Sequence, residues 1–170
     1  MSILEWLGLV PRPEPARDAS VVHRVARALE ALPAERAEHL ALFAFLLARV
    51  ANVDLDVHSA ETEAMARIVE TEGHLPPDQA ALVVEIAKAE HRASGETQNF
   101  LAARTFRDQA SDAERMDLVH CLFAVAASDG AISVAEEEAI REICRELRLT
   151  DRDYLHIRSA YSEHRSVNKR

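Results

Sequence analysis

Two stretches of the chain place an Asp and a Glu in the same frame. Residues 50–65 read VANVDLDVHSAETEAM, and residues 125–140 read VAASDGAISVAEEEAI. In each stretch an Asp ends an apolar helical run, and a Glu follows seven residues later. A shift of 75 residues superposes the four acids, Asp54 on Asp129 and Glu61 on Glu136. Repetition at one offset is typical of a duplicated unit, so the frame predicts one domain that contains a helical corner twice, related by a pseudo-twofold axis.

The pattern around these corners is helical throughout. Apolar residues recur at helical spacing, and the chain has only four Gly, six Pro and no alternating run of Val, Ile or Thr. Prolines mark helix starts at 33 and 76–77, and Ser-x-x-Glu capping boxes open helices at 111–114 and 133–136. We therefore expect an all-α domain of seven to eight helices, at about 18–31, 34–53, 59–72, from 76, 97–108, 111–128, 133–147 and from 150.

The predicted domain follows a short N-terminal segment. The stretch PRPEP at 11–15 cannot continue a helix, so residues 1–17 are predicted to be an amphipathic segment with a proline-rich linker. The helical domain then covers 18–165, and residues 166–170 form a basic tail. Within the domain the first repeat covers about 34–92 and the second about 111–164.

Each repeated Asp is predicted to continue an apolar stripe that faces the core. One helix face carries a series spaced four, three and four residues apart, Leu118, Leu122, Val125 and Asp129. A carboxylate at a helix C-terminus opposes the helix dipole by about 0.3–1 kcal/mol even when exposed, and burial without a partner costs more. Glu61 and Glu136 also lie on a core-facing stripe, but in a first turn, where the dipole favours them.

Two interpretations of these acids stay open. Asp-Gly pairs end helices and Ser-x-x-Glu boxes start them in proteins that bind no ligand, so the acids are explained as turns and caps. The functional hypothesis is that the pseudo-twofold brings Asp54, Glu61, Asp129 and Glu136 together. Four converging carboxylates require a cation, and oxygen ligands select a hard divalent ion such as Ca²⁺, Mg²⁺ or Mn²⁺. The spacing fits neither an EF-hand nor a di-iron bundle site.

Charge and cysteine content exclude other classes of function. There are 29 acidic residues against 20 basic ones, a formal net charge of −9, so we expect no nucleic-acid binding. The two cysteines, Cys121 and Cys144, lie in apolar stripes and are predicted to be reduced core thiols in a cytoplasmic protein, with a disulfide as the alternative. His120 is predicted to be a half-buried histidine, and the Glu run at 136–138 a solvated face apart from Glu136.

The first residues, MSILEWLGLV, are apolar but too short to span a bilayer, and they lack the features of a signal peptide. We therefore expect no transmembrane segment. An apolar set in this segment is a candidate contact for a membrane surface or a partner, namely Ile3, Leu4, Trp6 and Leu7. The alternative is that the segment folds back on its own domain.

The stretch AVAASDGAISVAEEEAIREICRELRL at 124–149 resembles the TerB-like domain of tellurite-resistance and stress-response systems, which also occurs in a membrane-anchored DnaJ-type co-chaperone. Residues 47–72 match the pattern more loosely, because Leu55 replaces the Gly. The resemblance implies an all-helical fold with this duplication, and a proposed metal site that falls on Asp54, Glu61, Asp129 and Glu136. It also implies a cytoplasmic location, protein partners at or near the inner membrane face, and no established catalysis. No His-Pro-Asp of a J domain occurs in the chain.

Three functions follow as hypotheses. The first is a non-enzymatic, metal-binding helical module in a cytoplasmic stress-response complex. The second is a pure protein-interaction or scaffold domain, in which the four acids serve only as helix caps and turn residues. Its partner could be a second copy of the chain, as a homodimer. The third is a hydrolase built on the same carboxylates, for which the sequence contains no evident base or nucleophile.

Overall fold

The computed structural model describes residues 16–51, 59–90 and 96–165, with side chains inside 23–51, 62–88 and 101–165. Across these ranges the chain is all-helical and has no strand. The α-helices are α2 (Ala16–Glu30), α3 (Ala34–Val50), α4 (Ser59–Glu72), α5 (Pro77–Glu90), α6 (Glu96–Gln109), α7 (Asp112–Ala126), α8 (Val134–Glu146) and α9 (Asp151–Ala160). The predicted all-α single domain is confirmed.

Local capping chemistry explains where the later helices begin. The Oγ atoms of Ser111 and Ser133 accept hydrogen bonds from the third backbone N–H of α7 and α8. In each case the side chain of the Glu at that third position accepts a hydrogen bond from the backbone N–H of the serine. Thr150 and Asp153 form the same capping box at the start of α9. These boxes satisfy backbone N–H groups that have no partner within the helix, so they set the helix start independently of tertiary packing.

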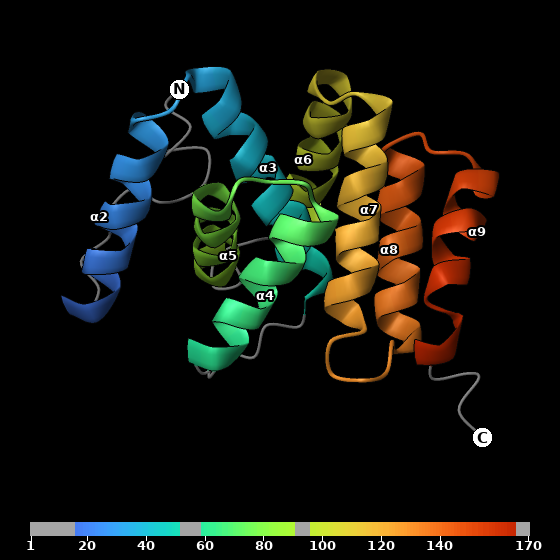
Figure 1. Ribbon diagram of the computed structural model, residues 1–170. Coiled ribbons are helices and arrows are strands. Elements are labelled where there is room, and N and C mark those ends of the chain that lie inside the picture. Colours follow the sequence, from blue (N-terminus) through green and yellow to red (C-terminus); the bar gives the residue numbers. More distant parts are fainter. Residues whose placement is uncertain (1–15, 52–58, 91–95, 166–170) are drawn as a thin grey trace.

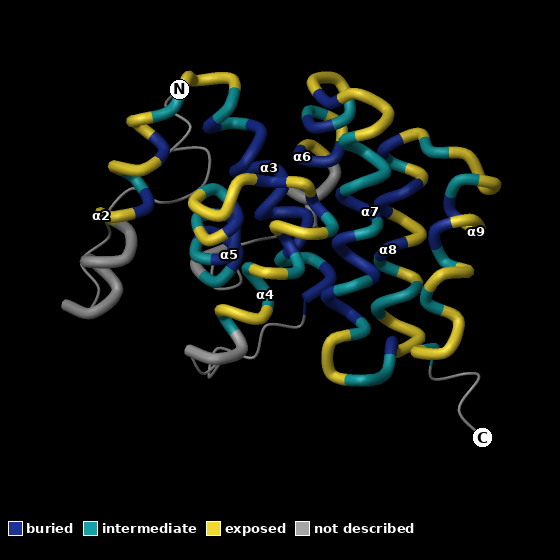
Figure 2. Tube along the Cα trace, viewed as in Figure 1, coloured by how far each residue is buried: buried dark blue, intermediate teal, exposed yellow. Residues whose placement is uncertain are grey.

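Helix α3 is the centre of the fold. It packs against α2, α5, α6, α7 and α8, and in Figure 1 its C-terminal half passes behind α4. All residues from Leu40 to Leu47 are buried, so this segment is covered on every side and not along one stripe. The run LALFAFLL is apolar all round, which is typical of a helix buried inside a domain. Figure 2 shows the resulting core as a dark band through α3, α7 and α8.

Helices α7, α8 and α9 stand side by side at one edge of the molecule (Figure 1). After α9 a 3-10 helix, η1 (Ser162–His164), turns the chain back toward the corner between α7 and α8. The Tyr161 ring stacks on Phe123 at 5.4 Å, and its hydroxyl donates to the His120 carbonyl at 3.1 Å. The C-terminal part of the domain is therefore attached to α7.

The helix bounds agree with the 75-residue offset seen in the sequence. Helices α4 and α8 begin 75 residues apart, and α5 and α9 begin 74 residues apart. The chain also enters the left-handed region just after α4 and α8, at His74 (φ 50°) and Arg148 (φ 55°). These matches are consistent with a duplication, which stays a prediction because the packing of the two halves differs: α3 packs against α2, α5, α6, α7 and α8, whereas α7 packs against α3, α4, α8 and α9.

Residues 1–15 of the predicted N-terminal segment, with Ile3, Leu4, Trp6 and Leu7, and the basic tail at 166–170 lie outside the described residues. The last two residues of the predicted segment, 16 and 17, already belong to α2. Among the helices that are described, none combines the length and apolar character that crossing a bilayer requires.

Candidate functional site

The prediction that Asp129 faces the core is wrong. Asp129 is exposed, and its Oδ1 atom accepts a hydrogen bond from the Ala131 N–H at 3.0 Å. The physical reason is that α7 ends at Ala126, so the helical spacing that leads from Val125 to Asp129 no longer applies. Gly130 follows with φ 98°, in the left-handed region that favours glycine. Asp129 thus closes a turn between α7 and α8.

Glu136 belongs to the capping box of α8. Its Oε2 atom accepts from the Ser133 N–H at 2.8 Å, while its own N–H donates to Ser133 Oγ at 3.2 Å. The side chain is half-buried in the first turn, where the helix dipole favours negative charge. The capping interpretation therefore accounts for Glu136 without a ligand.

The structure describes neither acidic side chain of the first corner, Asp54 or Glu61. Asp54 lies outside the described residues, and Glu61 lies in the first turn of α4 with its side chain outside them. Whether four carboxylates converge is thus untested. Among the side chains that the structure does describe, no group of three or more His, Cys, Asp or Glu residues could hold a metal ion.

Glu137, the neighbour of Glu136, does not lie on the solvated face that the sequence predicts for it. Its side chain is only 13% exposed, and its carboxylate accepts from Arg158 Nε at 2.6 Å and Arg165 Nε at 2.7 Å. Burial raises the pKa of Glu137, but the hydrogen bonds from Arg165 and Arg158 outweigh burial and hold this pKa below its usual value.

This ion-pair cluster holds the C-terminal segment across the corner. The Ile132 N–H donates to the His164 carbonyl at 2.7 Å, and Ile132 pairs with Arg165 in an isolated parallel bridge. Ile132 is itself fully buried. The corner that carries Asp129 and Glu136 is therefore fixed by backbone bonds, by two guanidinium groups and by core packing.

Two smaller predictions are confirmed. Cys121 and Cys144 are both free and buried, and burial is the main cause that raises their pKa values, to about 12 for Cys144 and higher for Cys121. His120 is half-buried, and burial lowers the pKa of its imidazole.

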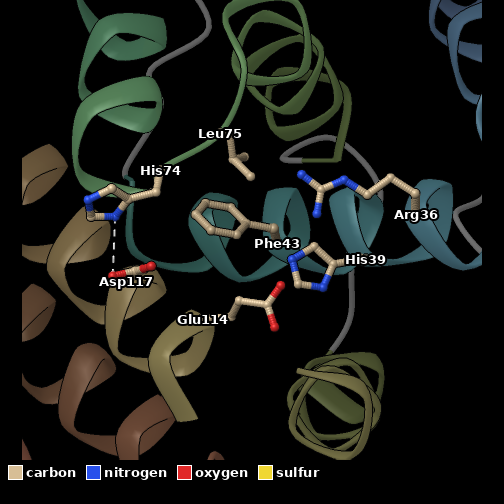
Figure 3. Close-up of a pocket in the computed structure, with 8 residues that line it drawn as sticks. Arg36, His39, Phe43, His74, Leu75, Glu114 and Asp117 are labelled. Atoms are coloured by element: carbon tan, nitrogen blue, oxygen red, sulfur yellow. Dashed lines mark ion pairs between the residues drawn. The ribbon is translucent and has the colours of Figure 1, made fainter. Parts of the chain in front are cut away.

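A polar cavity that sequence reasoning missed lies between α3, the α4–α5 connection and the first half of α7 (Figure 3). Its volume is about 140 Å³. Six side chains line its polar and aromatic parts: Arg36, His39, Phe43, His74, Glu114 and Asp117. In Figure 3 Arg36 and Glu114 reach toward His39 from opposite sides, and the ring of Phe43 lies between His39 and the ion pair of His74 with Asp117.

His39 is the unusual member of this set. It is 8% exposed and is the one buried polar side chain in the described part of the core. Its ring lies 4.8 Å from the ring of Phe106, and neither ring nitrogen has a hydrogen-bond partner among the described residues. Burial lowers the pKa of His39 despite the nearby Glu114 carboxylate, so the imidazole is neutral at pH 7. The ring nitrogens of His39 are not sealed from solvent, so water in the cavity can occupy the place of a protein partner.

The sequence contains one trace of this cavity. His39 directly precedes the apolar run LALFAFLL at 40–47, on the helix that is most deeply buried. A single histidine beside such a run is more often an ordinary core residue than part of a site. Its partners come from α7 and the α4–α5 connection, about 35 to 78 residues away in sequence, so no local motif could reveal them.

Comparison with known proteins identifies the family. The family model described as Tellurite resistance protein TerB matches residues 39–159, which is more than half of the chain. Comparisons with curated proteins and with solved structures gave no significant match. The matched range includes both the α7–α8 corner and most of the cavity lining. The chain therefore belongs to the TerB family of tellurite-resistance proteins.

Proposed function

We propose that this TerB-family protein is a non-enzymatic interaction module in a cytoplasmic tellurite-resistance or stress-response system. The proposal rests on the hydrogen bonds that Asp129 and Glu136 accept at the α7–α8 corner. Asp129 binds the backbone of its own turn, and Glu136 binds the backbone of its own cap. Acids with these roles stabilise a helical corner and need no ligand, which favours a scaffold that presents surfaces.

Charge and exposure indicate the kind of partner. The net charge of −9 favours a partner with a basic surface and an association that weakens as salt concentration rises. The exposed large apolar side chains include Val134 at the start of α8 and Leu155 on α9, each 54% exposed. Figure 1 places α9 at the open edge of the bundle. The two buried, free thiols support the cytoplasmic location.

A metal-binding module is the second candidate, and one observation favours it. Asp129 and Glu136 flank the same short turn, and each uses one carboxylate oxygen for a local backbone bond. Asp129 Oδ2 and Glu136 Oε1 accept no hydrogen bond from the described residues. Together with Asp54 and Glu61, these oxygens would form a site for Ca²⁺, Mg²⁺ or Mn²⁺ if the first corner lies nearby.

One experiment separates the two candidates. Metal-stripped protein is melted in the presence of Ca²⁺, Mg²⁺ or Mn²⁺, beside Asp129→Asn and the control Asp151→Asn in the exposed first turn of α9. The amide oxygen of Asn keeps the turn bond to Ala131 but removes the charge. The interaction module predicts no cation-dependent rise in midpoint at millimolar concentration. A rise that Asp129→Asn abolishes and Asp151→Asn retains would establish the metal module instead.

The interaction itself is tested by site-specific photo-crosslinking in cells. A photoreactive amino acid at Leu155 is expected to give an adduct of one defined mass in cells. In a cell lysate, the yield of that adduct should fall when the salt concentration is raised before irradiation. The same amino acid at the exposed Glu70 on α4 is the control. Equal adducts from both positions, or none from Leu155 and none from Val134, would contradict the proposal for this edge of the bundle.

A further inference from the structure

The cavity at His39 has two electrostatic poles. Arg36 supplies a positive pole, Glu114 and Asp117 supply a negative one, and His39 lies between them (Figure 3). We propose that this cavity binds a small zwitterion that carries one carboxylate and one amine, such as a free α-amino acid. The site is separate from the α7–α8 corner and independent of the function proposed for that corner.

The positive pole is held in place before any ligand arrives. Arg36 donates from Nε and from one terminal nitrogen to Gln79 Oε1, at 2.9 and 2.6 Å. Its other terminal nitrogen has no partner within the described chain. Because Gln79 is uncharged, the charge of the guanidinium is not neutralised by this contact. A carboxylate is the ligand group that fits such a fixed, partly occupied guanidinium.

The negative pole is fixed in a similar way. Glu114 uses Oε2 for the capping box, accepting from Ser111 N and Oγ at 2.8 Å each, and Oε1 accepts nothing from described residues. Those bonds from Ser111 are the main reason why the pKa of Glu114 is below its usual value. Asp117 lies at the same side, with Oδ1 3.3 Å from His74 Nδ1. A protonated amine is the complementary ligand group.

His39 is the second observation that indicates a ligand. It is more than nine-tenths buried, lines the cavity, and has no protein partner for either ring nitrogen. A neutral imidazole carries one donor and one acceptor, so it can bind a carboxylate oxygen or an ammonium proton. A zwitterion in the cavity would satisfy this otherwise unpaired group.

The same charges disfavour other ligands. An inorganic oxyanion would meet one guanidinium but also two carboxylates, and a simple cation would meet the fixed charge of Arg36. The described residues offer no cluster that could hold a metal ion. The volume of about 140 Å³ equals roughly four to five water molecules, and Phe43 and Leu75 provide an apolar wall, so the ligand is small with a short side chain.

The test uses the full chain and the twenty proteinogenic α-amino acids, added singly at millimolar concentration in thermal melts. We expect at least one to raise the midpoint. Its N-acetyl derivative and its methyl ester, which lack one charge each, are expected to bind at least tenfold more weakly. Inorganic phosphate is the oxyanion probe. Backbone amide chemical shifts are expected to change in α3, at Gly73 and in the first half of α7.

Glu114→Gln is the decisive variant because Gln also completes a capping box, so the fold is kept while the charge is removed. We expect it to weaken binding at least tenfold, whereas the exposed control Glu70→Gln leaves binding unchanged. The proposal is overturned if no amino acid binds, if phosphate binds better than every amino acid, or if Glu114→Gln leaves affinity unaltered.

Discussion

Glu137 and Glu138 are adjacent in sequence, but the structure predicts opposite consequences for removing their charges. Glu137 is 13% exposed and accepts three hydrogen bonds from Arg158 and Arg165, at 2.6, 2.7 and 3.0 Å. Glu138 is exposed. We therefore expect Glu137→Gln to destabilise the domain, because two guanidinium groups lose their carboxylate and the C-terminal segment loses its anchor to α8.

The magnitude follows from burial and bond number. A hydrogen bond to a charged group contributes about 1.5–3 kcal/mol, but the Gln retains one acceptor oxygen and both arginines are partly solvated, at 27% and 17% exposure. We expect a loss of about 2 kcal/mol in the free energy of unfolding. For a domain of this size that lowers the melting midpoint by about 4–8 °C. Glu138→Gln should stay within about 0.5 kcal/mol of the unsubstituted protein.

The dependence on pH gives a second check of the same ion pairs. The pKa of Glu137 is lowered in the folded state, so its stabilising effect is fully present above the unfolded pKa, about 4.3. That effect is lost as pH falls through the lower, folded-state pKa. The stability difference between the unsubstituted protein and Glu137→Gln should therefore be constant from about pH 7 to 5 and should shrink below about pH 4.

Urea titrations followed by circular dichroism measure the free energy of unfolding of each variant and, when repeated across the pH range, its dependence on pH. A double-mutant cycle with Arg165→Gln isolates the ion pair, and the double variant should lose less than the sum of the single losses. If Glu137→Gln and Glu138→Gln unfold at the same urea concentration at pH 7, the anchoring role that we assign to Glu137 is refuted.

Two further predictions concern the core. At Gly73 an added Cβ would lie 2.5 Å from the Val69 carbonyl oxygen and 3.0 Å from Phe43 Cζ. Gly73→Ala should therefore lower the free energy of unfolding, measured by urea titration, by about 1–3 kcal/mol. An unchanged urea midpoint would contradict this packing. Cys121 and Cys144 should not react with a thiol reagent at pH 8 until the protein is unfolded, because burial raises the pKa of Cys144 to about 12 and that of Cys121 further; rapid labelling of folded protein would disprove this.

Local sequence signals predicted the helices well. The capping boxes at Ser111 and Ser133 and the proline at 77 depend on residues within one turn of each helix start, and α7, α8 and α5 begin where these signals indicate. The family resemblance was likewise carried by one continuous stretch around Asp129, and the family match confirms it.

The candidate sites were harder to predict, because side-chain direction depends on where a helix stops and on what lies opposite. The spacing from Val125 to Asp129 indicated a buried acid only as long as α7 was assumed to continue, and α7 ends at Ala126. Likewise, nothing local distinguishes Glu137 from Glu138, since the arginines that bind Glu137 lie 21 and 28 residues further along the chain.

The sequence by itself determined the helix content, the starts of the capped helices, the buried thiols and the family, because each depends on periodicity, capping or a contiguous motif. Tertiary structure alone decided that Glu137 anchors the C-terminal segment, and that Arg36, His39 and Glu114 share one cavity. These features depend on contacts between distant segments. Such contacts form only when the apolar faces of several helices pack into one core, which places polar groups from separate helices at the same point.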